Sequence, residues 1–203
     1  MATRRTYLTS ASLQLAGRHA LAYARFLLPL GGAAVLLTVL GVGWYTQPDR
    51  YVRGYAPLQP IPYSHRLHAG VLKIPCQYCH SGVLRSRLAG IPSVDTCMNC
   101  HRVTKTESPH IRRLAALHES GRPLQWARVH ALPDHVYFDH RPHVSAGILC
   151  QTCHGEVQAM EVLSQEISLR MGNCLGCHRD AHDALPAGSD IAGGPEHCNA
   201  CHR

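Results

Sequence analysis

The cysteines of this chain all occur in one five-residue pattern, Cys-x-x-Cys-His, which appears five times and uses all ten of them. Residues three apart on a helical turn share a face, so both thiols of one pattern can form thioethers with the vinyl groups of a single porphyrin. The histidine that follows can then ligate the porphyrin iron. The spacing therefore predicts a covalent c-type heme at every motif, five in all. The residues are Cys76, Cys79 and His80; Cys97, Cys100 and His101; Cys150, Cys153 and His154; Cys174, Cys177 and His178; and Cys198, Cys201 and His202.

Other uses of paired cysteines fit this arrangement less well. A four-cysteine zinc site needs two pairs, and an odd number of pairs cannot be divided in that way. Redox-active Cys-x-x-Cys sites usually occur once in a protein and do not require a histidine directly after them. A disulfide framework would not restrict every cysteine to the same pattern.

Each iron that is six-coordinate also needs a distal ligand from outside its motif. His65 and His68 precede the first motif, and His140 and His143 precede the third motif with the same His-x-x-His spacing. In the small triheme and tetraheme cytochromes c, which these two segments resemble, a similar His-x-x-His supplies distal ligands to two different hemes. The resemblance implies that these four histidines are distal ligands.

The fifth distal ligand lies outside the two His-x-x-His segments. We expect it to be His130, which stands in Arg-Val-His before the third motif, with His135 as the second candidate. Met160 or Met171 would take this place if one heme had histidine and methionine as its axial ligands. The sequence leaves these alternatives open.

The motifs lie within an internal repeat. Residues 63–68, which lead into CQYCH, resemble residues 138–143, which lead into CQTCH, and each copy is followed by a second motif that ends in His-Arg. The chain therefore contains two diheme units, at about 62–102 and 136–179, and a fifth motif at 198–202.

The elements that position the motifs are expected to be short helices joined by irregular loops. One longer helix is predicted between the two units, with Ser108 as its N-cap, Pro109 at its first position and Gly121 after its end. The chain has only two Phe and two Trp, and small domains bury a smaller fraction of their surface than large ones. We therefore expect a mainly α fold in which hemes form most of the core.

Residues 26–45 form an uncharged run of 20 residues, which as a helix is about 30 Å long and matches a bilayer core. Four arginines and no acidic residue precede it, which places the N-terminus in the cytoplasm by the positive-inside rule. We expect a single-pass anchor in a bacterial inner membrane and a periplasmic heme domain. The expected parts are a cytoplasmic segment (1–25), a transmembrane anchor (26–46), a linker (47–61) and a pentaheme domain (62–203).

Two other interpretations of the basic N-terminal region fit less well. A cleaved signal peptide would use Gly41-Val42-Gly43 as its cleavage site, but the apolar run and the basic segment before it are both too long for one. The net charge of +7 does not indicate nucleic-acid binding, because four basic residues precede the anchor and heme propionates would offset the rest.

Four segments carry a resemblance to a known family: HRLHAGVLKIPCQYCH, AGIPSVDTCMNCH, WARVHALPDHVYFDH and MGNCLGCHR. With the N-terminal anchor, the chain closely resembles the pentaheme cytochrome c subunits of alternative complex III over most of residues 26–203. The resemblance implies a quinol-oxidising respiratory or photosynthetic complex with polytopic quinol-binding subunits, an iron-sulfur subunit and a monoheme cytochrome c. This chain would relay electrons from membrane quinol to a periplasmic acceptor or terminal oxidase, without substrate chemistry of its own.

Two further functions remain as alternatives. One is a stand-alone, membrane-anchored multiheme quinol dehydrogenase that feeds a periplasmic reductase and binds quinol itself. The other is a multiheme enzyme, which needs an iron with an open coordination position. The chain has more histidines outside its motifs than the distal positions require, which argues against the enzyme.

Overall fold

The computed structural model describes residues 10–47, 49–180, 185–189, 191 and 193–203. The chain divides into two compact units, Met1–Arg50 and Tyr51–Arg203, and each is described by itself. The described part is mainly helical, as the sequence predicts. Its strand-like pairing is limited to one isolated antiparallel bridge between Val136 and His202. Residues 1–9 of the expected cytoplasmic segment lie outside the described ranges.

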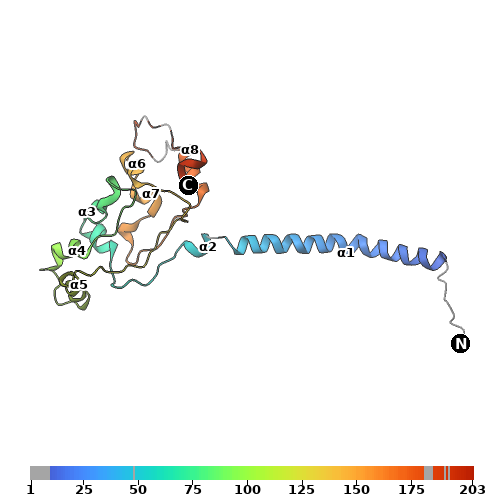
Figure 1. Cartoon of the computed structure of the whole chain (residues 1–203), viewed down its shortest axis with the longest axis horizontal. Coiled ribbons are helices and arrows are strands. Elements are labelled where there is room, and N and C mark those ends of the chain that lie inside the picture. The colour runs from blue at the N-terminus through green and yellow to red at the C-terminus, as the bar shows by residue number, and fades with distance from the viewer. Residues whose placement is uncertain (1–9, 48, 181–184, 190, 192) are drawn as a thin grey trace. The chain divides into compact units, whose positions relative to one another are not determined.

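The first unit is built on one long helix, α1 (Ser10–Tyr45), which Figure 1 shows in blue. The stretch Leu21–Val52 is long and apolar enough to cross a membrane by its length and composition, which is the candidate anchor that the sequence predicts. Its apolar side chains are exposed, with Phe26 at 76% and Leu28 at 74%. A helix that is apolar on all sides and has no protein partner is stable in a solvent as apolar as itself.

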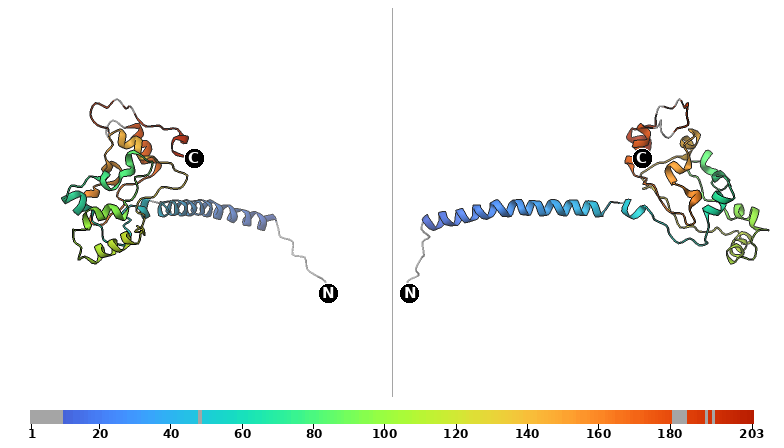
Figure 2. Two further views of the ribbon diagram at one scale, coloured as in Figure 1. Left: turned by 60° about the vertical axis from the view of Figure 1, so that its left-hand side comes forward. Right: turned by 180° about the vertical axis from the view of Figure 1, so that it is seen from behind.

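The second unit places each Cys-x-x-Cys pair on a short helix (Figures 1 and 2). One helical turn is enough to bring residues i and i+3 to one face, so these helices need not be long. The prediction of short helices at the motifs is confirmed. The motif helices are α3 (Cys76–Cys79), α4 (Val94–His101), α7 (Cys150–His154), α8 (Met171–Arg179) and α9 (Cys198–Cys201).

The other short elements lie between or before the motifs. A π-helical turn, η1, carries His68, and the α-helix α6 carries both His140 and His143. Single π-turns are uncommon and occur often at functional sites. These elements are α2 (Asp49–Val52), η1 (Arg66–Val71), η2 (Ser81–Leu84), α6 (His140–Ser145) and η3 (Val157–Ala159).

The longer helix predicted between the units is confirmed as α5 (Pro109–Glu119). Ser108 is its N-cap and Pro109 its first residue, and Gly121 follows its end with a φ of +63°, which glycine adopts without strain. Leu114 of α5 is 2% exposed and packs in one apolar cluster with two residues of α4. The buried residues of this cluster are Ile61, Val94, Met98 and Leu114.

Candidate heme-binding site

None of the ten cysteines of the motifs is in a disulfide. Burial raises the pKa of the Cys79 thiol, and the neighbouring Cys100 thiol raises it further. Burial likewise raises the pKa of the Cys97 and Cys153 thiols, with a further increase from cysteines of the neighbouring motifs. The thiols of different motifs therefore lie near one another, and each pair is available for covalent attachment.

Three of the motif histidines are held in one tautomer by the main chain. The Nδ1 atom of His80 donates to the carbonyl of Gly90 at 2.7 Å, that of His101 to the carbonyl of Thr104 at 3.0 Å, and that of His178 to the carbonyl of Pro195 at 2.7 Å. Because a carbonyl only accepts, the proton lies on Nδ1 and the lone pair on Nε2. A metal-ligating histidine is commonly oriented by such a bond.

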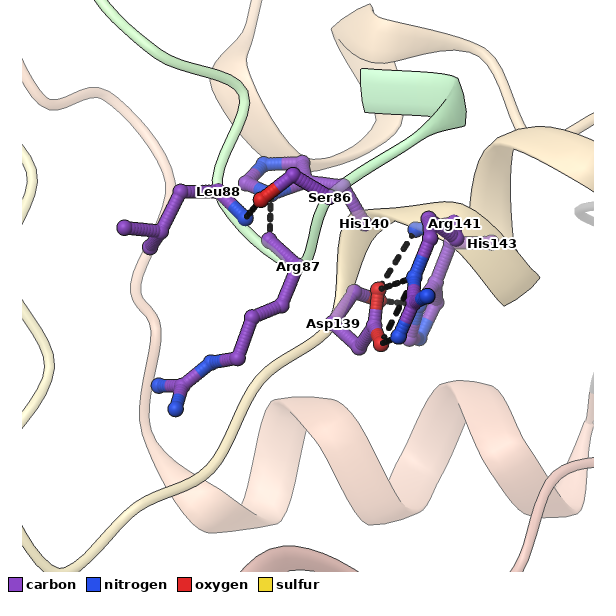
Figure 3. A network of polar contacts seen from close by, with 7 residues as sticks. All are labelled: Ser86, Arg87, Leu88, Asp139, His140, Arg141 and His143. Carbon is purple, nitrogen blue, oxygen red and sulfur yellow. Dashed lines mark hydrogen bonds and ion pairs between the residues drawn. The ribbon is translucent and has the colours of Figure 1, made fainter. Parts of the chain in front are cut away.

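Three of the four histidines in the His-x-x-His segments have the same arrangement. The Nδ1 atoms of His68 and His143 donate to the carbonyl four residues earlier, at 2.9 Å and 2.8 Å. That of His140 donates to the carbonyl of Arg87 at 2.9 Å. Figure 3 shows the rings of His140 and His143 with these contacts. Each ring is therefore also left with Nε2 as a free metal ligand.

These rings face motif histidines at a spacing that fits one iron between them. Two imidazoles that bind one metal from opposite sides, each through a bond of about 2 Å, have ring centres about 6 Å apart. The spacing therefore fits two axial ligands on opposite faces of a heme. The ring centres are 6.2 Å apart for His68 and His101, 6.4 Å for His140 and His154, and 6.0 Å for His143 and His178.

The sequence repeat is also a repeat of aromatic packing. Tyr63 stacks on His68 with ring centres 4.5 Å apart and meets the edge of His65 at 4.8 Å. Phe138 lies on His143 at 4.6 Å and meets His140 edge-on at 4.8 Å. Sequence reasoning did not assign a role to these two aromatic residues. Their matching places in the repeat were the signal that they position the histidine pair.

His65 is the remaining member of the first pair. Burial lowers its pKa to about 4, and the charges of His80 and His68 lower it further. Its Nδ1 atom is buried without a hydrogen-bond partner. His65 therefore lies near His80, the histidine of the motif that follows it.

The two candidates for the fifth distal position occupy different places. His135 lies nearly parallel to His202, with ring centres 5.6 Å apart and 19° between the ring planes. His130 instead meets the edge of His154 at 4.6 Å and 85°, and its Nε2 atom is buried without a partner. Burial lowers the pKa of His130. The structure thus brings His135, and not His130, within one axial-pair spacing of the histidine of the last motif.

The two methionine candidates differ in exposure. Met171 is the first residue of α8 and is 62% exposed. Met160 is half-buried, and its main-chain carbonyl accepts a hydrogen bond from the main chain of Arg66 at 2.8 Å.

His118 shows what a histidine without a ligand role looks like in this fold. Its Nδ1 atom lies 2.6 Å from a carboxylate oxygen of Asp95, and its Nε2 atom lies 3.2 Å from the guanidinium of Arg102. Both ring nitrogens are therefore occupied by charged partners, so the ring joins α5 to α4.

Comparison with known proteins agrees with this chemistry. Residues 136–203 match the family described as cytochrome c7 and related cytochrome c. Over 198 residues the chain is 27% identical to the multiheme cytochrome c subunit of a menaquinone reductase from Nitratidesulfovibrio vulgaris, covering 85% of this chain and 91% of that protein. Residues 136–203 therefore resemble a cytochrome c7 domain, and the two similarities support a multiheme cytochrome c.

Proposed function

We propose that this chain binds five c-type hemes and relays electrons from membrane quinol oxidation to a periplasmic acceptor or terminal oxidase. One observation carries the proposal. Several histidine rings lie opposite motif histidines with their ring centres 6.0–6.4 Å apart, which is the spacing of two ligands on one iron. Covalent heme, when bound, supplies one-electron oxidation and reduction at each site. The chain's own residues fix where each heme sits and what surrounds it.

Each motif would hold its heme by three bonds from one helical turn. Two thiols tether the porphyrin edge, and the histidine that follows ligates the iron through Nε2. The carbonyl partners of Nδ1 keep the ring in place and raise the basicity of Nε2. Two nitrogen ligands leave no open position at an iron, which favours a relay over an enzyme.

The facing rings suggest a distal ligand for each motif. The first histidine of each His-x-x-His segment would serve the first motif of its unit, and the second histidine would serve the second motif. The proposed axial pairs are His65 with His80, His68 with His101, His140 with His154, His143 with His178, and His135 with His202.

The hemes would also supply the interior that the side chains lack. Among the described residues, the buried apolar side chains are few, and the largest cluster they form holds only four. Porphyrins in the remaining space would bury apolar surface and exclude water from the irons. The buried apolar residues are Ile61, Val83, Val94, Met98, Leu114 and Val129.

The proposed setting is a membrane complex of the alternative complex III type, as the sequence resemblance implies. α1 would anchor the chain once in a bacterial inner membrane, with the N-terminus in the cytoplasm and the hemes in the periplasm. Polytopic quinol-binding subunits, an iron-sulfur subunit and a monoheme cytochrome c would be its partners. Homology to a subunit of a menaquinone reductase supports a quinone-linked membrane complex.

The name of that relative favours a second candidate function, in which electrons flow in the opposite direction. A menaquinone reductase transfers electrons to menaquinone, so a homologous chain could carry electrons from a periplasmic donor toward the membrane. The same axial pairs serve either direction, because a relay is reversible. The reduction potentials of the partners decide between the two.

Isolation of the complex from native membranes tests the proposal. We expect the chain to copurify with polytopic and iron-sulfur subunits, and its intact mass to exceed the apoprotein mass by five hemes. The Cys198→Ala, Cys201→Ala double variant is the matched control and should lose one heme only. A purified chain that oxidises quinol without partners would instead support the stand-alone quinol dehydrogenase. Thiols that remain free to alkylate would contradict heme attachment.

A further inference from the structure

We propose that the motifs follow one another in space in the order second, first, third, fourth, fifth, so that the two diheme units join through their first motifs. This inference rests on the proposed function only in that each motif carries a heme. The order differs from the order in the sequence, where the second motif stands next to the third. Contacts at the four junctions between neighbouring motifs carry the inference.

The second motif contacts the first motif directly. The side-chain amide of Asn99, between the two cysteines of the second motif, donates to the hydroxyl of Tyr78, between the two cysteines of the first, at 3.0 Å. In the same unit, His68, which precedes the first motif, has its ring centre 6.2 Å from that of His101 in the second motif. Hemes on these two motifs would therefore be neighbours.

The first motif joins the third through the loop that follows it. The main-chain carbonyl of Arg87, shortly after η2, accepts from both the main-chain nitrogen of His140 at 3.2 Å and its ring at 2.9 Å. Figure 3 shows the ring contact. The ring of His140 in turn faces His154 of the third motif.

A close approach of two main chains supports the same junction. A Cβ atom on Gly70, in η1, would lie 2.3 Å from the carbonyl oxygen of Gln158, in η3. Only glycine allows this contact. The side chain of Gln158 also accepts a hydrogen bond from Gln151 of the third motif at 3.3 Å. The segments that flank the first and third motifs are therefore packed together.

The third motif joins the fourth through α6, and the fourth joins the fifth through a loop. On α6, His140 faces the third motif and His143, one turn later, faces the fourth. The carbonyl of Pro195 accepts from the ring of His178 at 2.7 Å. Arg179 and Glu196 form an ion pair at 2.7 Å. The fifth motif begins two residues after Glu196 and is thereby held beside the fourth.

The order leaves the second and fifth motifs at the ends of the row. In Figure 1, α4 lies with α5 at one end of residues 51–203, and α8 lies with the C-terminus at the other. The residues between the second and third motifs, which include α5, return the chain to the middle of the row.

Redox coupling between hemes tests this order in the full-length holoprotein. Replacement of a distal histidine by methionine raises the reduction potential of one heme and lets it be followed separately. In a double-mutant cycle, we would measure the interaction between two such hemes as the departure of their reduction-potential shifts from additivity. The first cycle combines His140→Met with His143→Met, for neighbouring motifs. The second combines His140→Met with His68→Met, for motifs that the first motif separates.

We expect the coupling in the first cycle to be at least about twice that in the second. The interaction between two charges falls with distance and is screened further by solvent. Motifs arranged in sequence order would give equal couplings, which would overturn the proposal. An experimental structure of the holoprotein gives a second measurement that needs no variant. The distance between the irons at His80 and His154 must be shorter than the distance between the irons at His101 and His154. A five-heme relay that fails both tests would overturn the order and leave the proposed function intact.

Discussion

At the scale of single residues, the fold gives histidine two distinct environments. His68, His140 and His143 donate Nδ1 to a main-chain carbonyl, which leaves Nε2 as a neutral nitrogen ligand. His118 instead contacts a carboxylate and a guanidinium. A ring between two charged side chains has no lone pair to offer a metal. The hydrogen-bond partners therefore distinguish these three candidate ligands from His118.

The clearest test of this distinction is removal of a facing ring. His68→Ala should convert one low-spin iron to high-spin or exchange its ligand, because alanine leaves one axial position without a protein donor. His143→Ala should do the same at another motif. Electron paramagnetic resonance and optical spectra of the oxidised protein measure the change. His118→Ala is the matched control and should leave every iron low-spin; unchanged spectra in both ligand variants would refute these assignments.

Two variants can show whether His135 or His130 is the fifth distal ligand. His135→Ala should give a high-spin iron, because its ring centre lies 5.6 Å from that of His202, close to the spacing of two axial ligands. His130→Ala should leave the spectra unchanged, because its ring meets His154 edge-on. The same spectroscopy on both variants checks this prediction. The reverse result would return His130 to the ligand set.

At the scale of elements, α5 has a packing role at one end of the row of motifs. It buries Leu114 against Val94 and Met98 of α4, the helix that presents the second motif. Cys97 packs against the same cluster. The position of this motif therefore depends on an apolar contact with a helix that has no motif of its own.

Truncation of the central side chain in this contact should cost stability without loss of a cofactor. Leu114→Ala should lower the free energy of unfolding by about 2–5 kcal/mol, because Leu114 is fully buried and its removal leaves a cavity. Denaturation of the holoprotein followed at the heme absorbance measures the change. Leu58→Ala is the control, since Leu58 is 97% exposed, and it should change stability little. Equal effects of the two variants would refute the packing role.

At the scale of the whole molecule, the two units differ in the solvent that stabilises them. The apolar side chains of α1 remain exposed along residues 21–45, whereas residues 51–203 hold the motifs and the small apolar cluster. An exposed apolar helix of this length is the form that a bilayer stabilises. A bilayer would in this way hold the proposed electron relay at the membrane.

A charge in the middle of the apolar run of α1, residues 26–45, tests this tether. Leu36→Arg should reduce the membrane-integrated fraction, because a central arginine costs about 3 kcal/mol on insertion scales. Leu36→Ala should keep the chain in the membrane fraction. Extraction with alkaline carbonate, followed by detection of heme in the pellet, separates the two outcomes. Full release of the unmodified chain by carbonate would show that α1 is not an anchor.

The sequence by itself determined the features that depend on spacing within a few turns of chain. These are the Cys-x-x-Cys-His turns, the apolar helix and the ends of α5, because caps, periodicity and thiol spacing act locally. Only the tertiary structure decided which rings face each other. His68 and His101, or His135 and His202, lie far apart in the sequence, and the path of the loops between them sets their approach. The motif order has the same origin, since contacts such as Arg87 with His140 depend on how two distant segments fold back on each other.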